Sequence, residues 1–161
     1  MKLFLTLFIL LPLTSQASLD GVYHGSFNKN GYECEFNADI IQDTPGSITF
    51  KKWVTNCMDG EQQGPKTSVN GPLKYTFLPD QKVEVVVADD LSIYNTSKNS
   101  LTDSSFNLNY DFDAYLDGMV LNYDITIDLK LEKSVLKYTL KYIQNGQLIF
   151  SDIGIGQKLS R

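Results

Sequence analysis

The stretch SFNLNYDFDAYLDGMVLNYDITIDLKL, residues 105–131, decides the fold because apolar residues alternate with polar ones along two segments. Asp117-Gly118 separates the segments, and this dipeptide favours a two-residue hairpin because both positions tolerate a positive φ. A hairpin closed on that turn places Phe112 opposite Tyr123, and apolar residues meet apolar residues along its length. The stretch therefore predicts two antiparallel strands with one dry face and one wet face.

The alternation continues past this hairpin into further strands. A turn at Glu132-Lys133 gives a register in which apolar residues meet on the dry face and opposite charges meet on the wet face. The pairs predicted on this register are Leu129–Leu136, Ile127–Tyr138, Ile125–Leu140 and Tyr123–Tyr142 on the dry face, with Asp128–Lys137 and Asp124–Lys141 on the wet face. Asn145-Gly146 then favours a second two-residue hairpin before a last strand over 147–159.

The first half of the chain also alternates with a period of two, and turn residues separate its segments. The inner faces are predicted to carry Tyr23, Gly25 and Phe27, then Tyr32, Cys34, Phe36, Ala38 and Ile40, then Ile48, Phe50 and Val54, with Lys52 as an exception and Trp53 on the outer face. Across a turn at 79–81, Leu73, Tyr75 and Phe77 are predicted to face Val83, Val85 and Val87. Residues 58–71 are expected to form a long loop, and 89–104 a short edge strand and a loop.

These segments amount to about nine antiparallel strands, and helical periodicity is absent after residue 18. A sheet of this size with one apolar face must close or fold onto itself to bury that face and its edges. The chain is therefore predicted to be all-β, an up-and-down meander that closes into a barrel of about 8–10 strands. Gly21-Val22-Tyr23 resembles the Gly-x-Trp opening of the lipocalin family, with Tyr23 in place of the tryptophan. This resemblance implies a lipocalin-like barrel and assigns no binding residue.

Residues 1–17 are typical of an export signal that is removed from the mature protein. Lys2 supplies the positive start, residues 3–13 form a short apolar run, and Ser15-Gln16-Ala17 fits the cleavage rule. We expect a mature chain over 18–161 that folds as a single barrel domain and is secreted or periplasmic. In such an oxidising compartment, Cys34 and Cys57 are expected to form a disulfide, with Cys57 just past the end of the third strand.

The formal net charge of −5 argues against nucleic acid and against an anionic membrane surface as partners. No apolar run after residue 18 is long enough for a transmembrane helix, so membrane association is not expected. One alternative remains open, because an export signal followed by alternating strands is also the pattern of outer-membrane β-barrels. The C-terminus Lys158-Leu159-Ser160-Arg161, which lacks an aromatic residue, argues against that alternative, as does Lys52 on the apolar face.

The predicted interior is unusually rich in tyrosine. The residues concerned, which we take as candidate ligand-binding residues, are Tyr23, Tyr32, Tyr75, Tyr110, Tyr123, Tyr138 and Tyr142. A buried tyrosine needs a partner for its hydroxyl group, so this many on one face suggests a cavity that holds a small hydrophobic molecule. The alternative is a filled core, which would make the protein a structural or inhibitory interaction module.

Catalysis and metal binding have little support in the sequence. His24 is the sole histidine, lies on the polar face, and has no nucleophile or metal ligand near it in the chain. Asp111 is predicted to lie opposite Asp124, with Lys141 as the compensating charge. Asp113, Asp117 and Asp124 fall at EF-hand positions, but the flanking segments are strands. We therefore expect a protein that is not an enzyme and uses no metal or cofactor.

Apolar residues also interrupt the wet face at one end of the meander. They are Tyr115, Val120, Ile143, Leu148 and Phe150. An exposed apolar patch of this kind would mark a surface for a protein partner, unless the loop at 58–71 covers it. The sequence thus predicts a secreted or periplasmic, non-catalytic, lipocalin-like barrel that binds a small hydrophobic molecule or a protein partner.

Overall fold

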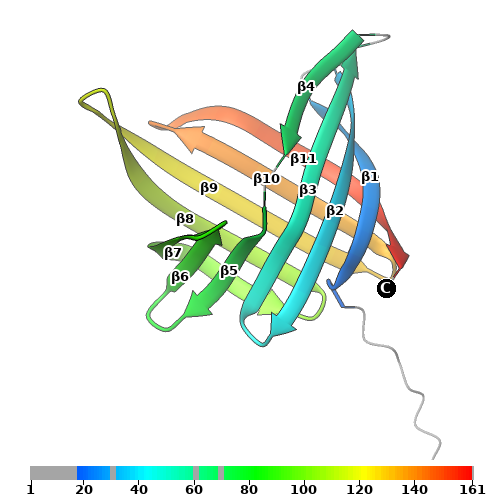
Figure 1. Cartoon of the computed structure of the whole chain (residues 1–161), viewed down its shortest axis with the longest axis horizontal. Coiled ribbons are helices and arrows are strands. Elements are labelled where there is room, and N and C mark those ends of the chain that lie inside the picture. The colour runs from blue at the N-terminus through cyan, green and yellow to red at the C-terminus, as the bar shows by residue number, and fades with distance from the viewer. Residues whose placement is uncertain (1–17, 30–31, 60–61, 69–70, 161) are drawn as a thin grey trace, which may run out of the picture.

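The computed structural model describes residues 18–29, 32–59, 62–68 and 71–160, and folds them into one antiparallel sheet of eleven strands (Figure 1). The strands are β1 Gly21–Lys29, β2 Tyr32–Thr44, β3 Ser47–Asp59, β4 Gln62–Ser68, β5 Leu73–Leu78, β6 Lys82–Val87, β7 Asp90–Thr102, β8 Ser105–Leu116, β9 Met119–Glu132, β10 Val135–Gln144 and β11 Gln147–Ser160. Ten of them close into an up-and-down barrel through the pairing of β2 with β3, while β4 extends the sheet beside β3. The predicted fold class is confirmed. The predicted export signal lies outside the described residues.

The β8–β9 hairpin has the register that its sequence predicts. Phe112 lies opposite Tyr123, and Asp111 lies opposite Asp124. The turn residues Asp117 and Gly118 have φ angles of 48° and 78°, the left-handed pair that a two-residue turn needs to match the twist of its strands. Asn145-Gly146 forms the same kind of turn between β10 and β11, with φ angles of 49° and 75°.

The predicted register of β9 against β10 is wrong by two residues. The observed pairs are Leu131–Leu136, Leu129–Tyr138, Ile127–Leu140 and Ile125–Tyr142. The turn lies one residue later than predicted, because Glu132 pairs with Val135 and Lys133 has a φ of 60°. A shift of one residue at the turn moves the register by two, so every side chain keeps its face and the hydrophobic pattern cannot reveal the error.

The charge pairing inferred from that register is also wrong. Ile143, not Lys141, lies opposite Asp124, and Asp124 Oδ1 accepts a hydrogen bond of 2.8 Å from Asn109 Nδ2. Lys137 forms its ion pair with Glu132, at 2.8 Å, and Thr139 takes the place predicted for Lys137 opposite Asp128.

A β-bulge in β3 turns Trp53 into the barrel. Asp39 pairs with Lys52 and Ile40 pairs with Phe50, so Lys51 is the additional residue that reverses the alternation. Beyond the bulge, Trp53 packs against the core and stacks on Phe36 with ring centroids 5.3 Å apart. The prediction that Trp53 faces outward and Val54 inward is therefore wrong.

Two segments predicted as loops are strands. Residues 62–68, within the predicted loop at 58–71, form β4 and pair with the far half of β3. The segment 89–104, predicted as a short edge strand and a loop, contains the whole of β7, a strand of 13 residues. β7 pairs with β6 through its first half and with β8 through its second. Their polar sequences hid both strands from the alternation pattern.

The disulfide is present between Cys34 and Cys57, which are directly paired residues of β2 and β3. Both cysteines are buried. Cys57 lies within β3 instead of past its end, because β3 continues to Asp59. The bridge therefore ties two long neighbouring strands near the start of β2 and the end of β3.

One end of the barrel is closed and densely packed. It carries the turns that join β2 to β3, β5 to β6, β7 to β8 and β9 to β10, and the N-terminal segment 18–20 lies against it. Leu19 is fully buried there, its carbonyl oxygen accepts a 2.8 Å hydrogen bond from Tyr23 Oη, and Lys158 Nζ donates to Ser18 O at 2.7 Å. We call this the closed end, and the opposite end, with the β6–β7, β8–β9 and β10–β11 turns, the open end.

Three inward-facing glycines make room for large rings beside β11. A Cβ atom on Gly25 or Gly156 would collide with the ring of Phe36, and one on Gly154 would collide with the ring of Tyr138. The predicted alternation of Ile153 and Ile155 is present, but these side chains are exposed and the glycines between them face inward. Aromatic rings from β2 and β10 thus occupy the space that side chains of β11 would fill.

Candidate ligand cavity

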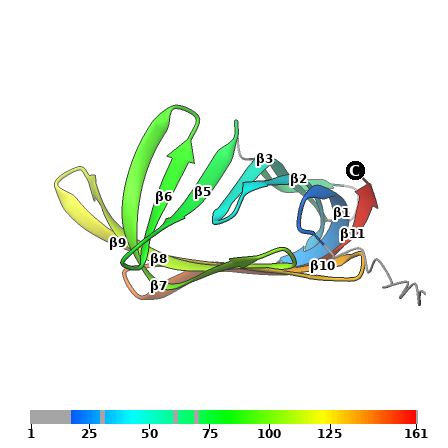
Figure 2. The ribbon, with the colours of Figure 1, turned by 90° about the horizontal axis from the view of Figure 1, so that it is seen from below.

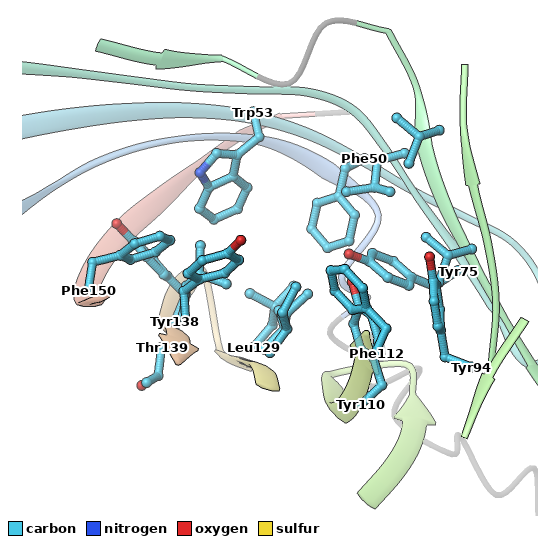
Figure 3. Close-up of a pocket in the computed structure, with 17 residues that line it drawn as sticks. Phe50, Trp53, Tyr75, Tyr94, Tyr110, Phe112, Leu129, Tyr138, Thr139 and Phe150 are labelled. Carbon is cyan, nitrogen blue, oxygen red and sulfur yellow. The ribbon is translucent and has the colours of Figure 1, made fainter. Parts of the chain in front are cut away.

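The barrel encloses a cavity of about 380 Å³ between its packed core and the open end (Figure 3). Its lining is almost entirely apolar. The aromatic lining residues are Phe50, Trp53, Tyr75, Tyr94, Tyr110, Phe112, Tyr138, Tyr142 and Phe150, and the others are Leu73, Val85, Val87, Ile125, Ile127, Leu129, Thr139 and Leu140. These residues come from β3, β5, β6, β7, β8, β9, β10 and β11, so most of the barrel wall contributes to the cavity.

The cavity lies where neighbouring strands of the barrel wall stop pairing, between the packed half of the barrel and its open end. The pairing of β7 with β8 stops at Thr96 and Tyr110, so residues 90–95 and 111–116 do not pair with each other. The pairing of β3 with β5 covers only Ser47 to Phe50. Figure 2 shows the β8–β9 hairpin running away from β5 and β6 on the far side of the barrel.

Aromatic rings form a continuous row along the cavity wall. Starting from Tyr94, ring centroids lie 5.3 Å apart to Phe112, 5.0 Å from there to Tyr123, 5.4 Å to Tyr142 and 5.3 Å to Phe150. Tilted and stacked pairs at these distances are favourable beyond the area that they bury. The wall is therefore held by packed rings on four neighbouring strands, β8 to β11, with Tyr94 added from β7.

The structure separates the seven predicted tyrosines into two groups. Four line the cavity, namely Tyr75, Tyr110, Tyr138 and Tyr142. The other three lie elsewhere. Tyr23 is fully buried at the closed end. Tyr32 packs against the core on β2, two residues before Cys34. Tyr123 lies in the aromatic row, and its hydroxyl oxygen accepts a hydrogen bond of 3.1 Å from Gln144 Nε2.

Two of the lining tyrosines bond to each other. Burial raises the pKa of Tyr110 to about 12, while a hydrogen bond from Tyr75 works against that rise. Burial also raises the pKa of Tyr75 well above its ordinary value, and Tyr110 adds to the effect. Both hydroxyl groups therefore stay protonated at neutral pH.

Five aromatic lining residues were not among the predicted site residues: Phe50, Trp53, Tyr94, Phe112 and Phe150. Phe50 and Phe112 were already predicted to face inward, and only the emphasis on tyrosine left them out. Trp53 was hidden by the bulge at Lys51, and Phe150 by a register shift between Tyr142 and Ile143 that turns it inward. The position of Tyr94 opposite Val83 on β6 could have identified it.

A buried charged residue, Asp152, lies near the cavity without being one of its lining residues. Asp152 is 5% exposed and faces inward on β11. Its Oδ2 lies 3.4 Å from Nζ of Lys29, which in turn lies 4.4 Å from the centre of the Phe150 ring. Burial raises the pKa of Asp152, and the Lys29 ammonium opposes that rise.

The candidate catalytic and metal-binding residues stay apart from the cavity. His24 is exposed on the outer wall, where its Nδ1 lies 3.1 Å from Asn37 Oδ1. Asp117 and Gly118 form the β8–β9 turn, at the tip of the hairpin. Within the described ranges, histidine, cysteine and acidic side chains form no group of three or more that could hold a metal ion.

The predicted apolar patch is exposed in part. Tyr115 is 80% exposed, and Val120 and Leu148 are also open to solvent, whereas Ile143 is half-buried and Phe150 lines the cavity. The segment proposed as its cover contains β4, which pairs with β3. The β8–β9 hairpin tip is therefore an uncovered apolar element at the open end.

No model of a known protein family matches this chain, and no curated protein matches its sequence. In the part of the chain that the structure describes, no helix is long and apolar enough to span a membrane. The function therefore has to be argued from the cavity.

Proposed function

We propose that this protein binds a small hydrophobic molecule in the cavity at the open end of its barrel, without catalysis, in a secreted or periplasmic location. The observation that carries the proposal is the cavity itself. Its volume of about 380 Å³ falls within the range of small-molecule sites, and its lining combines apolar walls with a few tyrosine hydroxyls.

The packing of the barrel supports this proposal over a filled core. Near the closed end, the inward-facing residues Ile48, Phe106 and Leu136 are fully buried. Near the open end, Phe112, Ile125 and Tyr142 are only half-buried although they face inward. A barrel that is filled in one half and hollow in the other supports ligand binding over an interaction module with a filled core.

The outer wall and the disulfide support the proposed location. Asp111, Asp128, Lys130 and Lys137 face outward, whereas a barrel in a lipid bilayer carries its apolar residues outward and its polar residues inward. The disulfide between Cys34 and Cys57 is compatible with an oxidising compartment outside the cytoplasm.

Trp53 offers a direct test, because it is the one tryptophan of the chain and it lines the cavity. We expect a neutral apolar dye such as Nile red to bind saturably, with energy transfer from Trp53 to the dye and a blue-shifted dye emission. Dye that stays in a water-like environment at all protein concentrations, or that binds without saturation, would contradict the proposal.

A pair of variants on β9 locates the binding. Ile125→Phe adds volume to the cavity lining and should weaken dye binding about tenfold, ~1.4 kcal/mol, because the ring takes up space that the ligand needs. Val120→Phe is the matched control, since Val120 is on the same strand but faces solvent. Equal affinities for the two variants, measured by fluorescence titration, would place the dye outside the cavity.

A further inference from the structure

Two buried oxygen atoms beside the cavity lack hydrogen-bond partners. They are Oδ1 of Asp152 and Oη of Tyr138, and none of the described residues supplies a partner to either. Asp152 is 5% exposed and Tyr138 is 3% exposed, so bulk water does not hydrate them. A buried polar group without a partner is costly, which makes two of them on one inner face unusual.

The two residues are neighbours on adjacent strands. Tyr138 pairs with Gly154 and Leu140 pairs with Asp152, so Tyr138 and Asp152 lie diagonally across the β10–β11 ladder on the inner face. The negative charge of Asp152 also raises the pKa of Tyr138, after the larger effect of burial, which is consistent with their proximity.

Tyr138 lines the cavity, and Asp152 lies next to residues that line it. Tyr138 and Leu140, on the strand next to Asp152, both line it, and so does Phe150, two residues before Asp152. Figure 3 shows Tyr138 and Phe150 together at one side of the cavity, opposite Tyr75 and Tyr94. The two unpartnered oxygen atoms therefore belong to the side of the molecule where Tyr138 and Phe150 line the cavity.

We propose that the ligand is an otherwise apolar molecule with a hydroxyl group, which it places between Asp152 and Tyr138. The ligand hydroxyl donates a hydrogen bond to Oδ1 of Asp152 and accepts a hydrogen bond from Oη of Tyr138. This inference rests on the proposed function of the cavity, and it names the chemical class of the molecule bound.

The charges around the two oxygen atoms favour a hydroxyl over other polar groups. A carboxylate can only accept hydrogen bonds, and it would face the Asp152 carboxylate. An ammonium group can only donate, and it would lie near Lys29, whose Nζ is 3.4 Å from Asp152 Oδ2. A hydroxyl group donates and accepts at once without adding a charge to the pair that Lys29 and Asp152 already form.

The test compares two aromatic probes that differ in one proton donor, 2-naphthol and 2-methoxynaphthalene, in displacing Nile red from the cavity. We expect the wild-type protein to bind 2-naphthol about tenfold more tightly, because only this probe can donate to Asp152. Asp152→Asn should bring the ratio of the two affinities towards one, because a neutral amide oxygen is a weaker acceptor than a carboxylate. Tyr138→Phe should weaken the binding of both probes, because the oxygen atom of either probe can accept a hydrogen bond from Tyr138. Tyr138→Phe removes a hydroxyl that has no partner, so this variant should fold as stably as the wild type.

Tyr115→Phe is the matched control, since Tyr115 is 80% exposed and does not line the cavity. It should leave both affinities unchanged. Equal binding of both probes to the wild type would overturn the inference, while the dye titration would still support the cavity as a binding site. Failure of the dye and of both probes to bind would overturn the proposed function, and the inference with it.

Discussion

Gly154 shows how a missing side chain shapes the barrel. The ring of Tyr138 lies over this glycine so closely that a Cβ atom at position 154 would collide with it. The ring is part of the cavity wall and also packs edge-on against Phe36 and Trp53, with centroids 4.8 Å and 5.1 Å away. A glycine on one strand therefore fixes the position of an aromatic residue on the next.

We expect Gly154→Ala to lower the free energy of unfolding by about 1–3 kcal/mol, because the added methyl group forces the Tyr138 ring and its neighbours to move. Urea denaturation of the wild type and the variant measures this loss. In a Tyr138→Leu background the same substitution should cost much less, since no ring covers position 154. An equal loss in both backgrounds would mean that the strain lies in the backbone instead.

At the residue scale, the sequence predicts which way most side chains face but misses local irregularities. Cys34, Phe36, Ala38 and Ile40 face inward as their alternation predicts. Trp53 does not, because one additional residue at Lys51 reverses the faces of everything that follows in β3. Lys52 on the predicted apolar face was the visible sign of this bulge, and it could have been read as a break in the strand.

At the scale of the strands, the disulfide joins two elements that are adjacent anyway. Cys34 and Cys57 are separated by 23 residues in sequence and are cross-strand partners in the β2–β3 hairpin. The bridge stabilises the fold mainly by restricting the unfolded chain, and a loop of this length gives about 3 kcal/mol. β2 and β3 also pair through their backbones from Glu33–Met58 to Thr44–Ser47.

We therefore expect Cys34→Ser with Cys57→Ser to keep the barrel but to unfold at lower urea concentration. The far-ultraviolet circular dichroism spectrum should be unchanged, and the free energy of unfolding should fall by about 3 kcal/mol. Adding a reductant should destabilise the wild type and leave the double variant unaffected. A double variant that has lost its β spectrum would mean that the bridge is needed to form the hairpin.

Turn residues predicted strand pairing better than strand residues did. Asp117-Gly118 fixes the register of β8 and β9, because both positions adopt a positive φ there. No comparable dipeptide separates β9 from β10, so the turn position had to be inferred from matching side chains. Several registers two residues apart match almost equally well there, and the incorrect one was supported by plausible charge pairs.

At the scale of the whole molecule, alternation predicts that the barrel closes but not how much of it is filled. Tyr23 and Tyr142 both occupy inward-facing positions of alternating strands. Tyr23 is nevertheless fully buried at the closed end, whereas Tyr142 lines the cavity. The difference arises where β7 leaves β8, at Thr96 and Tyr110, and where β3 leaves β5. Pairing between distant strands sets these points, and no local pattern encodes it.

The buried tyrosines should make the whole barrel sensitive to base. Burial raises the pKa of Tyr23 and of Tyr110 to about 12, whereas a tyrosine in the unfolded chain ionises near pH 10. Above about pH 10 the unfolded state loses these protons first, so stability is full below that pH and falls as the pH rises towards 12. Urea midpoints measured between pH 8 and 11.5 should decrease, and Tyr110→Phe should decrease less steeply. A midpoint that stays constant over this range would contradict the burial of these hydroxyls.

The seam between β7 and β8 bears on how the barrel moves. Residues 90–95 of β7 and 111–116 of β8 do not pair with each other. Their facing backbone N–H and C=O groups therefore need water as a hydrogen-bond partner. Opening the wall further from this point breaks only a few hydrogen bonds at a time, whereas opening it from the closed end would disrupt the packed core around Leu19 and Phe106. The barrel wall should therefore open most easily between β7 and β8, and the free energy of local unfolding should be lowest beside the cavity.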